Sequence, residues 1–182
     1  MDAIGKIEVG VVMQRRPLAN RWQPWQWRPL EVLELAGMPE LAAASGPRQL
    51  LNSHEDTRWL YPGFEVELFT DEAEGYFLNL SSPTPSWFIM WRKQPDESGS
   101  EDGELGVPHT VTLSYNQAAR LMDGGEQVDI LPAPPHVVAW MDSFVAKYYK
   151  PEPKRKRRKP SFEGGAAVDA MARAEKEPRD VG

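Results

Sequence analysis

The sequence of 182 residues contains no cysteine and no long apolar run. The missing cysteine excludes disulfides, iron–sulfur clusters and thiolate zinc sites. No stretch reaches the roughly eighteen apolar residues of a membrane span, and the N-terminus lacks the apolar core and the small-residue cleavage site of a signal peptide. We therefore expect a cytoplasmic protein that has no membrane span.

Signatures of catalysis are also missing from the sequence. It has no HExxH metal motif, no GxSxG elbow, no Walker loop and no strand–GxGxxG–helix unit. His54 precedes two acids, but metal ligands must converge from one face. His109 and His136 each follow a proline, which favours a polar role at the end of a strand or helix. We expect no metal site, no cofactor and no enzymatic activity.

The net charge of −6 divides unevenly along the chain. Residues 1–150 carry twelve Lys/Arg and twenty-one Asp/Glu, a net of −9, whereas residues 151–182 carry nine and six, a net of +3. We predict one globular β-rich domain over residues 1–150 and a disordered basic tail over 151–182. The tail holds six consecutive basic residues, namely Lys154, Arg155, Lys156, Arg157, Arg158 and Lys159.

Such a basic run can bind nucleic acid, anionic lipid or an acidic protein patch. It is short and has no interleaved aromatic residues, so we favour contact with protein, or with the acidic body, over nucleic acid. An acidic body also disfavours nonspecific binding of nucleic acid over most of its surface.

Apolar periodicity indicates that the body consists mainly of strands. Strands are expected at Ile7–Met13, Trp25–Leu33, Phe64–Leu68, Tyr76–Leu80, Trp87–Trp91 and His109–Leu113. Trp87–Trp91 is apolar throughout, as expected of a strand covered on both faces. A hairpin turn is expected at Asp71–Gly75, and loops at Arg15–Gln23 and Gln94–Gly106. Pro39–Asn52 predicts either a short helix or a loose connection.

Two helices are expected near the end of the domain. Ser114 and Gln117 fit a capping box that opens a short helix, which Gly124 and Gly125 end. Pro135 then opens a second helix with an apolar stripe of Val137, Trp140, Met141, Phe144 and Tyr148. The expected class is α+β. It has five to seven mostly antiparallel strands in a sheet or a partly open barrel, capped by the C-terminal amphipathic helix, a PH-like outline by analogy.

One segment combines arginine and tryptophan and lacks acids. From Val9 to Leu30 there is no Asp or Glu, although the rest of the body is acidic. Trp and Arg are enriched where proteins bind partners, so we predict a binding surface. Its residues are Arg15, Arg16, Asn20, Arg21, Trp22, Trp25 and Arg28. The alternative is that Trp25 and Trp27 are core residues and the arginines answer nearby acids. We expect Trp27 in the core and Trp22 at the contact.

The segment RRPLANRW within Met13–Trp27, the segment Asn116–Gly125 and the basic KRKRRKPSF resemble a proteobacterial family catalogued as a domain of unknown function, number 3305. The resemblance covers roughly residues 7–162. It implies an accessory role, because members tend to be encoded near genes of molybdenum-dependent formate dehydrogenase. Some relatives are labelled as molybdopterin–guanine dinucleotide biosynthesis proteins. The glycine-rich nucleotide loop of those enzymes is absent here.

Three hypotheses about function follow. The first is a non-enzymatic accessory protein that binds a formate dehydrogenase subunit or a maturation factor through Arg15, Arg16, Arg21, Trp22 and their neighbours. The second is a protein that binds a flat anionic ligand such as a pterin phosphate or a nucleotide, which requires a pocket with indoles and two arginines. The third is binding of nucleic acid by the tail.

Overall fold

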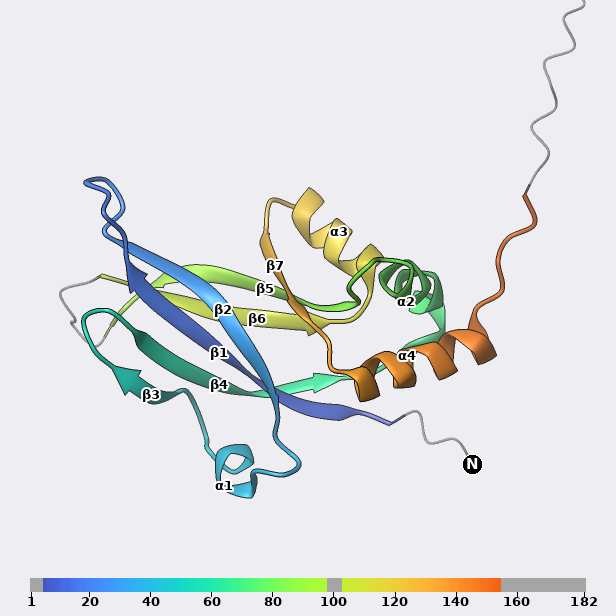
Figure 1. The fold of residues 1–182 in the computed structure, drawn as a ribbon, viewed down its shortest axis with the longest axis horizontal. Helices are drawn as coiled ribbons and strands as arrows, with labels where there is room; N and C mark the ends of the chain where they lie inside the picture. Colours follow the sequence, from blue (N-terminus) through green and yellow to red (C-terminus); the bar gives the residue numbers. More distant parts are fainter. Residues whose placement is uncertain (1–4, 98–102, 155–182) are drawn as a thin grey trace, which may run out of the picture. The chain divides into compact units, whose positions relative to one another are not determined.

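The computed structural model describes residues 5–97 and 103–154, which form two antiparallel sheets and four α-helices (Figure 1). One sheet has the strand order β2-β1-β4-β3, with β1 (Ile7–Pro17), β2 (Trp25–Glu34), β3 (Arg48–Asn52) and β4 (Thr57–Val66). The other has the order β6-β5-β7, with β5 (Ser86–Pro95), β6 (Glu104–Thr112) and β7 (Gln127–Pro132). The helices are α1 (Pro39–Ala42), α2 (Ala73–Leu80), α3 (Tyr115–Asp123) and α4 (Pro135–Tyr148), with a 3-10 turn at Thr70–Glu72. The predicted α+β class is confirmed.

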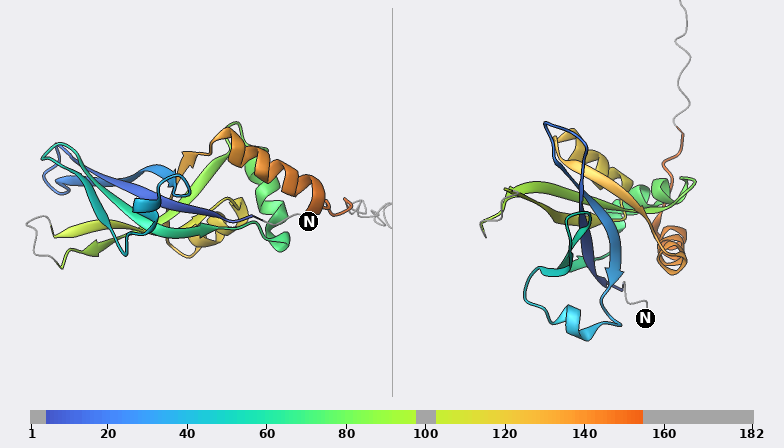
Figure 2. Two further views of the ribbon diagram at one scale, coloured as in Figure 1. Left: turned by 90° about the horizontal axis from the view of Figure 1, so that it is seen from below. Right: turned by 60° about the vertical axis from the view of Figure 1, so that its left-hand side comes forward.

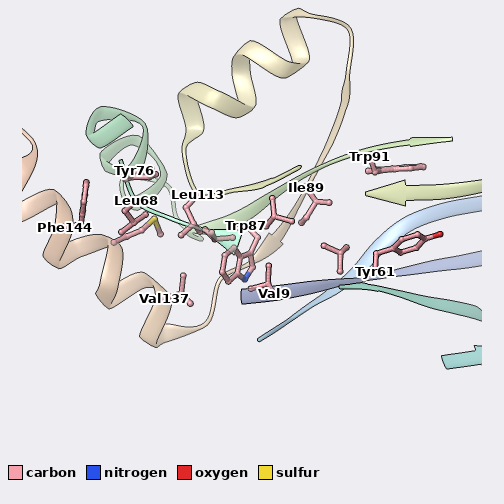
Figure 3. Close-up of a cluster of buried hydrophobic side chains, with 14 of the residues drawn as sticks. Val9, Tyr61, Leu68, Tyr76, Trp87, Ile89, Trp91, Leu113, Val137 and Phe144 are labelled. Atoms are coloured by element: carbon pink, nitrogen blue, oxygen red, sulfur yellow. The ribbon is translucent and has the colours of Figure 1, made fainter. Parts of the chain in front are cut away.

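The core lies between the two sheets. From the first sheet, Val9, Val11 and Met13 of β1 are fully buried, because alternate residues of a strand point to one face. Trp87 and Trp91 of β5 face them, and Figure 3 shows Trp87 beside Val9. The residues on the other side of β5 are also buried. The expectation that this strand is covered on both faces is confirmed.

Helices α2, α3 and α4 gather at one end of the sheets, and the β1–β2 connection lies at the other (Figures 1 and 2). Helix α4 buries Val137, Met141 and Phe144 of its predicted stripe. The Phe144 ring meets Tyr76 of α2 edge to face, with ring centroids 5.6 Å apart. The stripe therefore packs against α2. A cap on the sheet in the manner of a PH-like barrel stays a prediction.

The predicted cap of α3 is confirmed in one of its two bonds. The Ser114 hydroxyl oxygen accepts the Gln117 backbone N–H at 3.1 Å. The return bond does not come from Gln117. Instead, the Thr112 hydroxyl accepts the Ser114 N–H at 3.1 Å and donates to Gln117 Oε1 at 2.6 Å. Thr112 thus links the end of β6 to the start of the helix.

The hairpin predicted at Asp71–Gly75, with a return strand at Tyr76–Leu80, is wrong. The segment is helix α2, and its buried positions Ala73, Tyr76 and Asn79 follow helical spacing, whereas Leu78 is exposed. Gly75 does not form a turn. A Cβ there would lie 2.1 Å from the Ser114 hydroxyl oxygen, so the glycine permits close contact between α2 and the start of α3.

Other boundaries also differ from expectation. Strand β1 extends into the predicted Arg15–Gln23 loop, because Arg15 pairs with Trp27 on one side and with Thr57 on the other. The predicted loop at Gln94–Gly106 is shorter, since β5 and β6 pair as far as Pro95 opposite Glu104. Strands β3 and β7 were not expected. Both are edge strands with little apolar alternation, and tertiary pairing decides their conformation.

The seven strands fall within the predicted number, but they form two sheets rather than one. In the described part of the chain they do not close into a barrel. No helix within residues 5–97 and 103–154 has the length and apolar character needed to cross a membrane. Of the predicted basic cluster, Lys154 is described and exposed, and Arg155 to Lys159 lie outside the described residues. The predicted domain boundary and the predicted disorder of the tail stay predictions.

Candidate binding site on the β1–β2 hairpin

The connection between β1 and β2 carries an exposed tryptophan. The Leu18 N–H donates to the Pro24 carbonyl at 2.8 Å and closes the loop of residues 18–24. Inside it, Asn20 Oδ1 accepts the Trp22 N–H at 3.0 Å, which fixes the backbone next to the indole. Trp22 is 88% exposed, and Figure 1 shows the loop projecting beyond the sheets. Apolar rings of this size are usually buried in monomeric domains.

One face of the hairpin, which we call the indole face, carries Trp25, Trp27 and Arg15. Trp27 is 5% exposed, as predicted for a core residue, and packs so closely on Gly106 of β6 that a Cβ there would lie 2.8 Å from Trp27 Cβ. Trp25 is half-buried between two partners. The Arg15 Cζ lies 4.1 Å from the centroid of the Trp25 indole, and the His54 ring meets the indole at 5.5 Å between centroids.

A groove opens beside the indole face at the end of the second sheet. It has a volume of about 280 Å³ and is lined by Trp22, Gln23, Pro24, Trp25, Trp27, Lys93 and Glu104. The three indoles supply apolar walls, while Lys93 of β5 and Glu104 of β6 add one charge of each sign. This chemistry suits an apolar or aromatic side chain that carries a polar end. The ligand hypothesis required two arginines in the pocket. Among the described residues that line the groove, the basic residue is Lys93 instead.

The opposite face, which we call the arginine face, carries Arg16, Arg28 and Arg58 with Gln14 and Asp56. The register places Gln14 directly opposite Arg28 on β2 and Arg58 on β4. Gln14 is 5% exposed although it is polar, and both ends of its amide are bonded. Its Oε1 accepts Arg28 Nε at 2.9 Å, and its Nε2 donates to Asp56 Oδ1 at 3.1 Å.

Asp56 is the anion within the arginine face. Arg58 donates to it from Nη2 at 2.8 Å and from Nε at 3.1 Å. These bonds, then that of Gln14, hold the pKa of the Asp56 carboxyl below its ordinary value of 3.8, and the nearby charge of Arg16 adds to the effect. Among the described residues, neither Arg16 nor Arg28 forms an ion pair with a carboxylate, so this face keeps positive charge.

The predicted binding residues are thus one block in sequence and several surfaces in space. Arg15 and Trp25 lie on the indole face, Arg16 and Arg28 on the arginine face, and Asn20, Arg21 and Trp22 in the loop. The predicted loop at Arg15–Gln23 is wrong for Arg15 and Arg16, because both belong to β1. That these residues contact a partner stays a prediction.

Several residues of this site were not predicted from the sequence. Gln14 was recognisable as a polar residue in an otherwise apolar strand, and Asp56 and Arg58 as an i, i+2 pair. Lys93 and Glu104 gave no such signal, because β5 and β6 bring them to the groove from distant parts of the sequence. The acid-free segment therefore receives acids from other parts of the chain, Asp56 from the β3–β4 connection and Glu104 from β6.

A second hollow and the histidines bring no further predicted residues together. The hollow, of about 580 Å³, lies between α1 and β3 and is lined in part by Met38, Leu41 and Arg48. His136, at the start of α4, has its Nε2 2.6 Å from Glu34 Oε1, as expected of a residue at a helix end. His109 contacts Gln94 from within β6, so the expected role at a strand end is wrong for it. Within the described ranges, no three His, Asp or Glu side chains are grouped so that they could hold a metal.

Comparison with known proteins identifies a family whose function is unknown. No curated protein and no solved structure matches the chain. The family model described as protein of unknown function, DUF3305, matches residues 8–158, which include the hairpin, both sheets and α4. With most of its length matched, the chain belongs to the DUF3305 family.

Proposed function

We propose that this chain is a non-enzymatic cytoplasmic accessory protein that binds a partner protein through the β1–β2 loop and the groove beside it. The resemblance noted above directs the choice of partner to a subunit or a maturation factor of molybdenum-dependent formate dehydrogenase. The hairpin presents the predicted contact residues Arg21 and Trp22 at its tip.

The observation that carries the proposal is the exposure of Trp22. Trp22 is 88% exposed on a loop whose backbone two hydrogen bonds hold in place, so little backbone entropy is lost when a partner covers it. The groove extends from Trp22 to Trp25 and Trp27, and an apolar side chain of a partner can bind against these rings. A buried Trp anchor of this kind typically contributes about 2 kcal/mol or more to a protein interface.

The test is co-purification from native cells, with the captured proteins quantified by mass spectrometry. The R21A/W22A variant should lose most of its partner, since two central contacts at about 2 kcal/mol each weaken binding by several hundredfold. The control is I130A/K150A, which removes an apolar and a basic side chain that are both exposed and lie outside the loop of residues 18–24 and the groove lining. Equal capture by the two variants would contradict the proposal.

The groove also supports a second candidate, a small flat ligand stacked on the indoles. Its volume of about 280 Å³ is near the lower end of the range for ligand pockets, roughly 300–1,000 Å³, so we rank this candidate second. Lys93 would pair with an anionic group, while Glu104 would repel it.

Tryptophan fluorescence and calorimetry with pterins and guanine nucleotides test this candidate. Binding should be weakened by Lys93→Gln and little changed by Lys150→Gln, because Lys93 lies in the groove and Lys150 follows α4. A lack of response to every one of these compounds would argue against the ligand.

A further inference from the structure

We infer that the arginine face binds a carboxylate-bearing, acidic segment of a protein partner. Arg16, Arg28 and Arg58 lie on one side of three neighbouring strands, β2, β1 and β4, and all three are at least partly exposed. The inference rests on the proposed function, because it names the chemistry that a partner must offer beside the Trp22 contact.

The guanidinium groups of Arg28 and Arg58 are held in place by a network around a buried amide. The Gln14 side chain sits in the middle of the face and is tied on one side to Arg28 and on the other to Asp56. Asp56 in turn holds Arg58 through the bonds described above. A buried glutamine with both ends satisfied fixes the spacing of its neighbours, so Arg28 and Arg58 are ordered before any partner arrives.

The charges of this face are not balanced. The face holds three arginines and Asp56: Arg58 and Arg16 act on Asp56, while Arg28 bonds Gln14. Glu31 is the other acid that acts on Arg58. One positive charge therefore remains on a body whose residues 1–150 carry a net of −9. The negative charge on the rest of the body repels an acidic segment of a partner. Such a segment would therefore be directed to the arginine face.

Carboxylates fit the face better than phosphate groups. Asp56 already shows a carboxylate held by the Arg58 fork, with Nε donating to Oδ1 and Nη2 donating to Oδ2. Charge alone does not separate the two groups, because a phosphate dianion would double both the attraction by the three arginines and the repulsion by Asp56 and Glu31. Separate carboxylates spread the charge over Arg16 and Arg28.

The experiment is an NMR titration of the full chain with a hexaglutamate peptide, followed through arginine Nε–Hε signals. We expect shifts at Arg16, Arg28 and Arg58, and about tenfold weaker binding to R16Q/R28Q. The control K6Q/K150Q has the same change in net charge at two exposed lysines away from this face. It should bind almost as the wild type does.

Equal weakening in the two variants, or shifts outside the arginine face, would overturn the inference, because binding would then follow net charge alone. The choice of carboxylate would be overturned if inorganic phosphate shifted the same signals at a lower concentration than hexaglutamate, with both concentrations counted per negative charge. The fate of the proposed function is separate, since it depends on capture of the partner by R21A/W22A. If R21A/W22A loses the partner but the wild type does not bind hexaglutamate, the proposed function stands and this inference fails.

Discussion

The two faces of the β1–β2 hairpin are built from the same short segment, yet they differ in chemistry. On the indole face, Trp27 is buried against Gly106 of the second sheet, and Trp25 lies between Arg15 and His54. On the arginine face, Arg16 and Arg28 lie around a buried Gln14, and Asp56 joins them from the connection that precedes β4. One face mainly holds the domain together, and the other remains open and charged.

The difference arises because consecutive strand residues point to opposite sides. Arg15 contacts the Trp25 ring, whereas Arg16 influences Asp56 on the other face. The composition of the segment suggests a single surface, but its arginines and tryptophans lie on different faces of the hairpin. The comparison predicts that substitutions on the indole face cost stability and that those on the arginine face cost much less, as the following four tests measure.

The largest effect is expected for Trp27→Ala. Trp27 is 5% exposed and packs on β6, so its loss leaves a cavity between the sheets. The free energy of unfolding should fall by about 3–5 kcal/mol. Urea unfolding measures it, with Trp22→Ala as the control that should change stability by less than about 0.5 kcal/mol. Comparable losses in the two variants would remove the division between core and contact tryptophans.

Gly106→Ala should be the next most damaging substitution. Its new Cβ would meet Trp27 Cβ at 2.8 Å and Cγ at 3.0 Å, so the two sheets must separate slightly. We expect a loss of about 1–3 kcal/mol in the free energy of unfolding. Gly37→Ala is the matched control, since nothing lies within 4 Å of a Cβ there. A neutral result at Gly106 would show that the sheets yield easily.

Gln14→Ala tests whether the buried amide organises the arginine face. The substitution removes one bond to Arg28 and one to Asp56, but both charged groups remain partly exposed and can bind water. We expect a loss of about 1 kcal/mol in stability. The Arg28 Nε–Hε signal should also move and broaden in NMR spectra. An unchanged Arg28 signal would show that Gln14 does not hold the guanidinium.

The smallest effect is expected for the pH dependence of stability that comes from Asp56. The pKa of Asp56 is lowered in the folded state, so its contribution to stability is complete above its ordinary value of 3.8 and is lost as pH falls through the lower folded value. The melting temperatures of wild type and Asp56→Asn should therefore differ at neutral pH and converge in acid. Arg58→Gln should reduce this pH dependence, because Arg58 supplies the largest part of the shift. A difference that persists at the lowest pH would assign it to packing.

Sequence patterns predicted the elements with strong local signals. The apolar β1 and β5, the Ser114 cap and the proline-led α4 were found where expected. The patterns failed at α2, where Tyr76, Leu78 and Leu80 mimic strand alternation and the true helical burial includes Asn79. Asn79 is buried because its amide bonds the carbonyls of Ser86 and Leu113, both at 2.9 Å, and no local pattern reveals those partners.

The sequence by itself determined the α+β class, the core role of Trp27 and the contrast between an acidic body and the acid-free segment from Val9 to Leu30. Periodicity and charge are properties of the chain, so they can be read along it. The tertiary structure alone decided that the hairpin arginines lie on different faces, that Lys93 and Glu104 join the indoles, and that Asp56 enters the arginine face. Strand pairing makes these contacts between residues far apart in sequence, and the register sets which of them share a face.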